Sequence, residues 1–96
     1  MNNIVVISED CPTIIKPKIL DKLFQGMVPD IIDSATKMLF RDGTLIDILK
    51  ANPSELTGKK PNRIYLDESL SLGQYNTIKF EIELMACNNN CQVQYI

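Results

Sequence analysis

The feature that most constrains how this chain folds is a ten-residue segment in which apolar and polar side chains alternate. The segment, TIKFEIELMA, runs from Thr77 to Ala86. Successive side chains of a β-strand point to opposite faces of a sheet, so a period of two predicts a strand with one face on a core. The predicted core face comprises Ile78, Phe80, Ile82, Leu84 and Ala86. The opposite face, open to water or a partner, comprises Lys79, Glu81, Glu83 and Met85.

A second strand, with the sequence CQVQYI, is predicted to pair with the first through an asparagine-rich turn. A loop over 88–89 or over 88–91 brings the apolar faces of both strands together, because a slip of one residue moves every side chain to the other face. Asn tolerates the positive φ that a tight type I′ turn requires. We therefore expect a C-terminal β-hairpin that exposes Gln92 and Gln94 and has a free outer edge, to which another chain can add a strand.

Other segments predict the remaining elements. A β-branched run at 3–8 and the sequence RIYLD at 63–67 indicate two further strands. Apolar residues at helical spacing, followed by glycine or proline, indicate helices between these strands. The predicted helices are 17–28, 29–43 and 44–52. The pattern leaves open whether Ile14 and Ile15 belong to a strand or to a helix.

Together these elements predict a small single α+β domain that spans residues 1–96. Strands towards both ends, with two or three helices between them, favour helices packed on one face of a mostly antiparallel sheet. Of the 96 residues, 45% are apolar and 23% are charged, which is typical of a folded domain rather than a disordered chain.

The chain contains no histidine. This absence removes the commonest general base, the commonest metal ligand, and the Ser-His and Cys-His nucleophile pairs. We therefore expect a protein that is not an enzyme and that needs no cofactor. The net charge of −2 also lacks the basic excess of most nucleic-acid-binding proteins.

The segment MLFRDGTLIDI resembles the D-x-D-G-T-L signature of haloacid dehalogenase-type phosphatases. Asp42, Gly43, Thr44 and Leu45 match the second half of that signature. The nucleophilic carboxylate belongs two residues before Asp42, where this chain has Phe40. Covalent phospho-aspartate chemistry is therefore not expected. We interpret Gly43 and Thr44 instead as the end of one helix and the N-cap of the next.

A basic loop, TGKKPNR, supports an alternative function in nucleic-acid binding through Lys59, Lys60 and Arg63. The loop lacks the first glycine and the final Ser or Thr of a phosphate-binding loop. It also lacks an interleaved aromatic residue on which a base would stack.

The cysteines support a second alternative, a thiol or metal protein that uses Cys11, Cys87 and Cys91. A structural zinc site needs four ligands, and three cysteines without histidine supply too few, so no metal site is predicted. In the predicted hairpin with a two-residue loop, Cys87 and Cys91 lie on opposite faces of the sheet. We therefore expect them not to be bonded to each other.

The preferred interpretation is a small cytoplasmic binding or regulatory protein that acts by protein–protein contact. A phage or mobile-element inhibitor and an accessory subunit both fit this description, and the expected partner is another protein, a second copy, or both. No apolar run approaches the roughly 20 residues that span a bilayer, and the start of the chain does not resemble a signal peptide, so no membrane is expected. The predicted contact residues are Lys79, Glu81, Glu83, Met85, Gln92 and Gln94.

Overall fold

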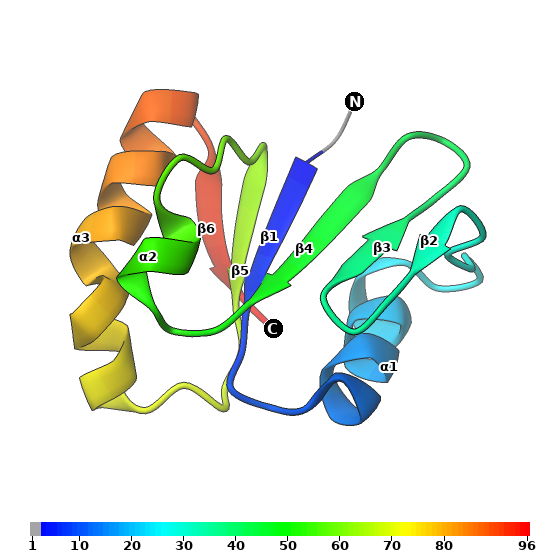
Figure 1. Ribbon diagram of the computed structural model, residues 1–96, viewed down its shortest axis with the longest axis horizontal. Coiled ribbons are helices and arrows are strands. Elements are labelled where there is room, and N and C mark those ends of the chain that lie inside the picture. Colours follow the sequence, from blue (N-terminus) through cyan, green and yellow to red (C-terminus); the bar gives the residue numbers. More distant parts are fainter. Residues whose placement is uncertain (1–2) are drawn as a thin grey trace.

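The computed structural model describes residues 3–96, which form three helices and a six-stranded mixed sheet (Figure 1). In chain order the elements are β1 (Asn3–Ile7), α1 (Pro12–Leu23), β2 (Ile32–Asp33), β3 (Lys37–Leu39), β4 (Leu45–Leu49), α2 (Pro53–Leu56), β5 (Arg63–Leu66), α3 (Leu72–Asn89) and β6 (Gln92–Tyr95). Within this part of the chain, no helix combines the length and apolar character needed to cross a membrane.

The sheet is built around β1. Its strand order is β2-β3-β4-β1-β5-β6. β1 runs parallel to both of its neighbours, β4 and β5, and β6 runs parallel to β5. β2 and β3 extend the β4 side as antiparallel strands. Parallel pairings therefore dominate among the described strands, and the predicted mostly antiparallel sheet is wrong.

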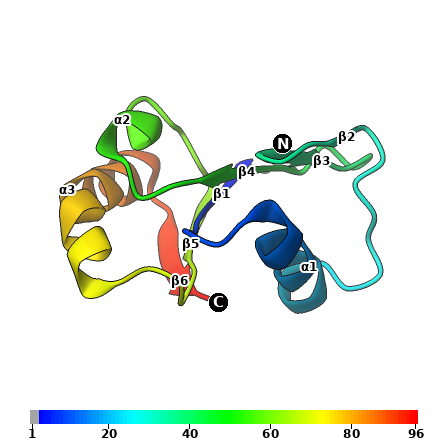
Figure 2. The same ribbon diagram turned by 60° about the horizontal axis from the view of Figure 1, so that its bottom comes forward.

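The helices cover both faces of the sheet, with α1 on one face and α2 and α3 on the other (Figure 2). A helix that links two parallel strands must cross over one face, and such crossovers are right-handed. The chain moves from β1 out to β4 and then back past β1 to β5, so these two crossovers lie on opposite faces. The predicted coarse class, a small α+β domain, is confirmed, whereas the predicted placement of all helices on one face is wrong.

Two apolar layers meet at β1, which is buried on both faces. Ile4 and Val6 pack in the layer beneath α1, together with Ile15 and Ile19 of that helix. Val5 and Ile7 pack in the layer beneath α2 and α3. Burying one side chain of this size contributes about 2 kcal/mol. The prediction of a buried strand at 3–8 is confirmed, and so is the strand at 63–67, which forms β5.

The predicted strand at 77–86 is wrong, because these residues lie within α3. Ile78, Ile82 and Met85 have helical spacing as well as apolar side chains, and they are the buried residues of the helix. A capping box starts the helix: the Ser71 hydroxyl accepts the Gln74 N–H at 3.1 Å, and the Gln74 side chain accepts the Ser71 N–H at 2.8 Å. This local signal favours a helix over the alternating pattern.

The predicted C-terminal hairpin is also not formed. Asn90, with φ of 50°, ends α3 in the left-handed conformation rather than turning between two strands. The chain then enters β6, which pairs with β5 so that Val93 lies opposite Ile64 and Gln94 opposite Tyr65. Asparagine serves here as a helix cap because it tolerates the same positive φ that a hairpin turn would use.

The predicted helices at 29–43 and 44–52 are wrong as well, because these residues form the meander β2-β3-β4. The turn between β2 and β3 is held by Ser34, whose N–H donates to the Lys37 carbonyl at 2.9 Å. Gly43, with φ of 92°, closes the turn between β3 and β4. Asp-Gly is a strong hairpin signal, and here it marks a turn rather than a helix end.

The helix predicted at 17–28 begins earlier, at Pro12, and ends at Leu23. Proline suits this first helical position, because the N–H that it lacks would have no hydrogen-bond partner within the helix. Pro17 lies inside α1 instead of opening it. Ile14 and Ile15 are helical, and Ile15 is fully buried.

We expect Ser71→Ala to lower the free energy of unfolding by about 1 kcal/mol, because the first turn of α3 loses its side-chain acceptor. Ser71→Asn keeps an acceptor at this position and should retain most of the stability. Urea denaturation followed by circular dichroism measures both effects. Equal stability of Ser71→Ala and the wild type would contradict the capping role.

Candidate functional site

The carboxyl ends of β1 and β5 meet where the chain leaves the sheet in opposite directions. The loop after β1 leads to α1 on one face, and the loop after β5 leads to α3 on the other (Figure 2). Such switch points are the usual ligand crevices of open α/β sheets. Here Ser8 and Asp67 lie at the switch point, and they are 0% and 2% exposed.

Hydrogen bonds surround the Asp67 carboxylate. Its Oδ2 accepts the Ser8 hydroxyl at 2.9 Å and the Ser69 N–H at 3.3 Å, and its Oδ1 accepts Nζ of Lys18. Ser8 Oγ also accepts the Asp10 N–H at 3.1 Å. The network therefore joins β1, α1 and the loop between β5 and α3.

Electrostatics keep this network ionised. Burial alone would raise the pKa of Asp67, but hydrogen bonds from Lys18, Ser69 and Ser8 outweigh it and lower the pKa from 3.8 to about 2. The hydrogen bond to Asp67 also raises the pKa of Lys18. Because the Asp67 side chain is 0% exposed, its carboxylate presents no free surface to a ligand. We therefore interpret the network as a structural feature that connects the segments of the chain meeting at the switch point.

We expect Asp67→Asn to destabilise the fold by about 2 kcal/mol, because Lys18 loses its buried carboxylate partner and keeps only the exposed Glu68. The folded pKa of Asp67 lies below the unfolded value. Its stabilisation, about 2 kcal/mol, is therefore fully present above about pH 4 and is lost as the pH falls towards 2.

Urea denaturation between about pH 6 and pH 2 tests this assignment, with Asp21→Asn on the exposed side of α1 as the control. The free energy of unfolding of Asp67→Asn should fall less steeply at acidic pH than that of the wild type. Asp21→Asn should show the same fall as the wild type. An unchanged acid limb in Asp67→Asn would contradict the role of this carboxylate.

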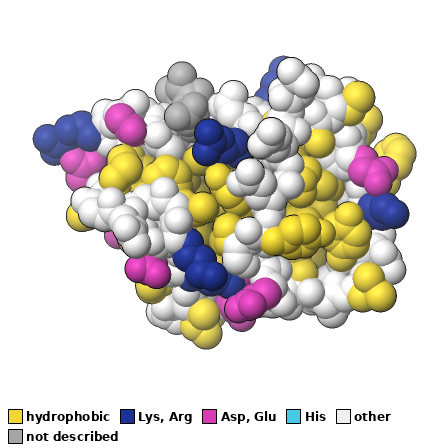
Figure 3. All heavy atoms as spheres, turned by 180° about the vertical axis from the view of Figure 1, so that it is seen from behind, with side chains coloured by type: hydrophobic (Ala, Val, Ile, Leu, Met, Phe, Trp, Pro, Cys, Tyr) yellow, Lys and Arg dark blue, Asp and Glu magenta, His cyan; other side chains and the backbone are white. Residues whose placement is uncertain are grey.

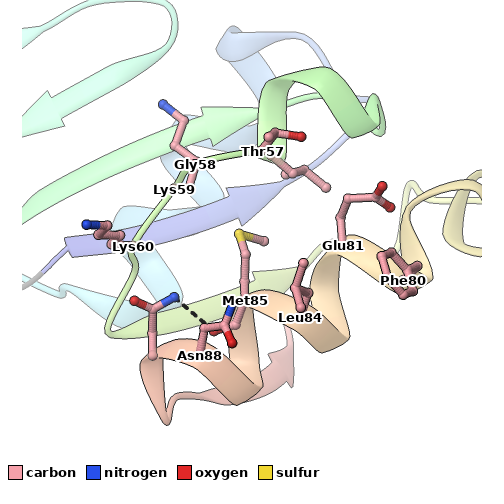
Figure 4. Close-up of a pocket in the computed structure, with 11 residues that line it drawn as sticks. Thr57, Gly58, Lys59, Lys60, Phe80, Glu81, Leu84, Met85 and Asn88 are labelled. Carbon is pink, nitrogen blue, oxygen red and sulfur yellow. Dashed lines mark hydrogen bonds between the residues drawn. The ribbon is translucent and has the colours of Figure 1, made fainter.

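An open cavity lies elsewhere, between α2, the loop after it, and α3 (Figure 4). We call it the α2–α3 groove, and its volume is about 600 Å³. Leu56 and the loop residues 57–60 line one wall. The other wall comes from α3 and comprises Phe80, Glu81, Leu84, Met85, Asn88 and Asn89.

The local sequence explains the position of the wall that Leu56 and residues 57–60 form. The Asn52 side chain caps α2 by accepting the Ser54 N–H at 3.1 Å, and Pro53 occupies the first helical position. The helix ends at Leu56, which is fully buried and anchors this wall to the core. Gly58, with φ of 83°, then lets the chain turn towards the two lysines.

The α3 wall presents an exposed apolar ridge. Phe80 is 69% exposed and Leu84 is 48% exposed, and their spacing of four residues puts them on the same side of the helix. Asn88 continues this row. The face turned away from the view of Figure 1 also exposes apolar side chains, in a band across its middle (Figure 3). The ridge borders the α2–α3 groove, a hollow large enough for the side chains of another molecule.

Charges stand at both ends of the groove. Figure 4 shows Lys60 and Glu81 on opposite sides of Met85, with Lys59 on the loop above the lysine end. None of these three charged groups forms an ion pair with another residue in 3–96. The groove is therefore apolar in its middle, positive at one end and negative towards the other.

The structure divides the predicted contact residues among different surfaces. Glu81 lines the groove, whereas Lys79 and Glu83 are exposed outside it. Met85 is only 6% exposed, so its prediction as a surface residue is wrong. A helix turns by about 100° per residue, and alternate residues therefore do not share a face. Gln92 and Gln94 are exposed on β6, at the edge of the sheet.

The predicted basic loop is brought only partly together. Lys59 and Lys60 line the α2–α3 groove, whereas Arg63 is exposed at the start of β5 and does not line it. Phe80 and Leu84 were assigned to a core face by the alternating pattern, so their role as an exposed ridge was missed. The capping box at Ser71 was the signal that indicates a helix here.

The three cysteines are free thiols at separate positions. Cys11 is exposed before α1, Cys87 is exposed on α3, and Cys91 packs against the layer beneath α3. The predicted opposite sheet faces do not arise, because Cys87 lies in a helix. Within residues 3–96, no group of three or more His, Cys, Asp or Glu side chains is placed to hold a metal ion.

Cys11 and Cys91 lie in different surroundings: Cys11 is exposed, whereas Cys91 is partly buried. A side-chain hydrogen bond with Thr13, 3.0 Å between Sγ and Oγ1, lowers the pKa of Cys11, whereas burial raises the pKa of Cys91. We expect iodoacetamide to modify Cys11 faster than Cys91 at neutral pH. Peptide mass spectrometry over a time course measures both rates, and Thr13→Val should slow Cys11 while leaving Cys91 unchanged. Faster modification of Cys91 would contradict this order.

Comparison with known proteins assigns no family to this fold and groove. No protein-family model matches the chain, and no curated protein matches it. The function is therefore argued from the geometry of the groove.

Proposed function

We propose that this protein acts by protein–protein contact through the α2–α3 groove and not by catalysis. The observation that carries the proposal is the exposed ridge of Phe80 and Leu84 beside a cavity of about 600 Å³. Large apolar side chains exposed together beside a hollow are typical of binding surfaces. Their burial against a partner removes apolar area from water, which is the main driving force of association.

The polar groups of the groove support a binding role. They are Thr57, Lys59, Lys60, Glu81 and two asparagines. The Thr57 hydroxyl donates to the Pro53 carbonyl, and among residues 3–96 none of the three charged groups hydrogen-bonds to a hydroxyl or thiol that it would activate. Lysine and glutamate at the rim of an apolar surface orient a partner and discourage incorrect ones. We infer that this is a regulatory or inhibitory protein of the cytoplasm. Its effect depends on a partner protein that occupies the groove.

Single-stranded nucleic acid is the second candidate, because Phe80 lines the same groove as Lys59 and Lys60. An aromatic side chain beside lysines is the combination on which a base stacks while its phosphate is neutralised. Glu81 stands next to Phe80 and would repel that phosphate, and the chain carries a net charge of −2. These charges favour a protein partner over nucleic acid.

We expect Phe80→Asp to abolish partner capture while leaving the fold intact, because Phe80 is exposed and its loss costs little stability. The experiment retrieves proteins from the native cell with tagged wild type, Phe80→Asp and Leu72→Asp. Leu72 is the matched control, since it is 76% exposed on α3 but lies outside the groove. Quantitative mass spectrometry compares the three sets.

A protein captured by the wild type and by Leu72→Asp, but lost with Phe80→Asp, would support the groove as the contact surface. The same proteins retained by all three baits would overturn the proposal. Binding of a single-stranded oligonucleotide that depends on Phe80 and weakens steeply with salt would favour the second candidate instead.

A further inference from the structure

The α2–α3 groove has a charge arrangement that complements itself. Along α3, Leu84 lies three residues after Glu81 and four residues before Asn88, which corresponds to about 5 and 6 Å along the helix axis. Figure 4 shows Lys60 at the end of the groove where Asn88 lies, with Glu81 beyond Leu84 towards the other end. Opposite charges therefore stand on either side of Leu84.

A two-fold axis through Leu84 would exchange these ends. In an isologous pair, the same patch meets itself in reverse, so Glu81 of one copy faces the lysines of the other, and the converse holds at the opposite end. The apolar side chains at the centre of one copy's groove then pack against those of the other copy. A parallel arrangement would instead place lysine on lysine and glutamate on glutamate.

The exposed row of α3 suits the packing of one helix on another. Phe80, Leu84 and Asn88 are four residues apart, and rows with this spacing form the ridges that interdigitate in the commonest class of helix–helix packing. Within residues 3–96, no strand borders the groove, so an added β-strand would find no described edge to pair with there. A helix with its own exposed ridge is the element that fits.

We propose that the groove's partner is a second copy of this chain, bound through antiparallel packing of the two α3 helices. This inference rests on the proposed function and names the molecule that fills the groove. Leu84 of both copies forms the shared apolar centre, and Phe80 of each copy extends it on the Glu81 side. Two reciprocal contacts between Glu81 and the Lys59–Lys60 pair fix the antiparallel direction. These contacts are exposed, so they select the arrangement more than they stabilise it.

Sedimentation equilibrium of the full chain from about 1 µM to about 1 mM tests the pairing. The wild type should dimerise, and Phe80→Asp should weaken dimerisation more than about thirtyfold, because each copy loses a large apolar contact and gains a charge that the interface would bury. Leu72→Asp, outside the groove, should dimerise as the wild type does. Raising the salt concentration should weaken the wild-type dimer moderately.

Charge reversal tests the antiparallel direction. Glu81→Lys alone, and Lys59→Glu with Lys60→Glu, should each weaken dimerisation about tenfold, because like charges then face each other at both ends. The chain that carries all three substitutions should recover most of the wild-type affinity. A merely structural effect of these substitutions would add up and would not be rescued.

Several outcomes would overturn the inference. A wild type that stays monomeric across this range excludes self-pairing, and a Phe80-dependent capture of a different protein would then leave the proposed function standing. A dimer that survives Phe80→Asp lies on another surface. Dimerisation that depends on Phe80 without rescue by the triple charge reversal excludes the antiparallel arrangement.

Discussion

The pairing of β1 with a parallel strand on each side is the constraint on which the rest of the structure depends. β1 is hydrogen-bonded to β4 and β5, and Val5, Val6 and Ile7 are nearly or fully inaccessible to water. Such a strand must have cover on both faces. The chain supplies it with α1 on one side and with α2 and α3 on the other. Without β1, neither helical layer would have a continuous apolar surface to pack on.

The hydrogen-bond network around Asp67 links the sheet to α3, the helix that forms one wall of the groove. It fixes the loop after β5, and the Leu70 N–H donates to the Asp67 carbonyl at 3.2 Å one residue before the cap of α3 at Ser71. The loop that leads into α3 is thereby joined to Ser8 after β1 and to Lys18 of α1. The exposed ridge at Phe80 and Leu84 takes its direction from this anchored end. The buried hydrogen-bond network around Asp67 thus helps to position the helix that carries the exposed ridge of Phe80 and Leu84.

The sequence allowed the central strand and β5 to be predicted, because buried parallel strands are recognisable as short β-branched or apolar runs. It did not allow α3 to be predicted from hydropathy. Ile78 and Ile82 satisfy both a period of two and a helical spacing, and Phe80 and Leu84 add apolar residues that the helix leaves exposed. Phe80 and Leu84 stand where an ordinary amphipathic helix would be polar. The capping residues around Ser71 carried the information that hydropathy lacked.

The groove residues could be predicted only in part, for a related reason. Lys59 and Lys60 are adjacent in sequence and were recognised as a basic loop, but their closeness to Phe80 and Glu81 depends on tertiary packing of α2 against α3. No local pattern encodes that distance. The same packing determines when the groove comes into existence. β1 pairs with strands that lie about 40 and 60 residues later in the chain, and closing such long loops is the slow part of folding. The two walls of the groove flank β5 in sequence, and Leu56, Ile82 and Met85 share one apolar layer with Val5 and Ile7 of β1, so we expect the groove to form as that layer closes. The proposed partner would then bind only folded molecules and, by mass action, stabilise them against unfolding.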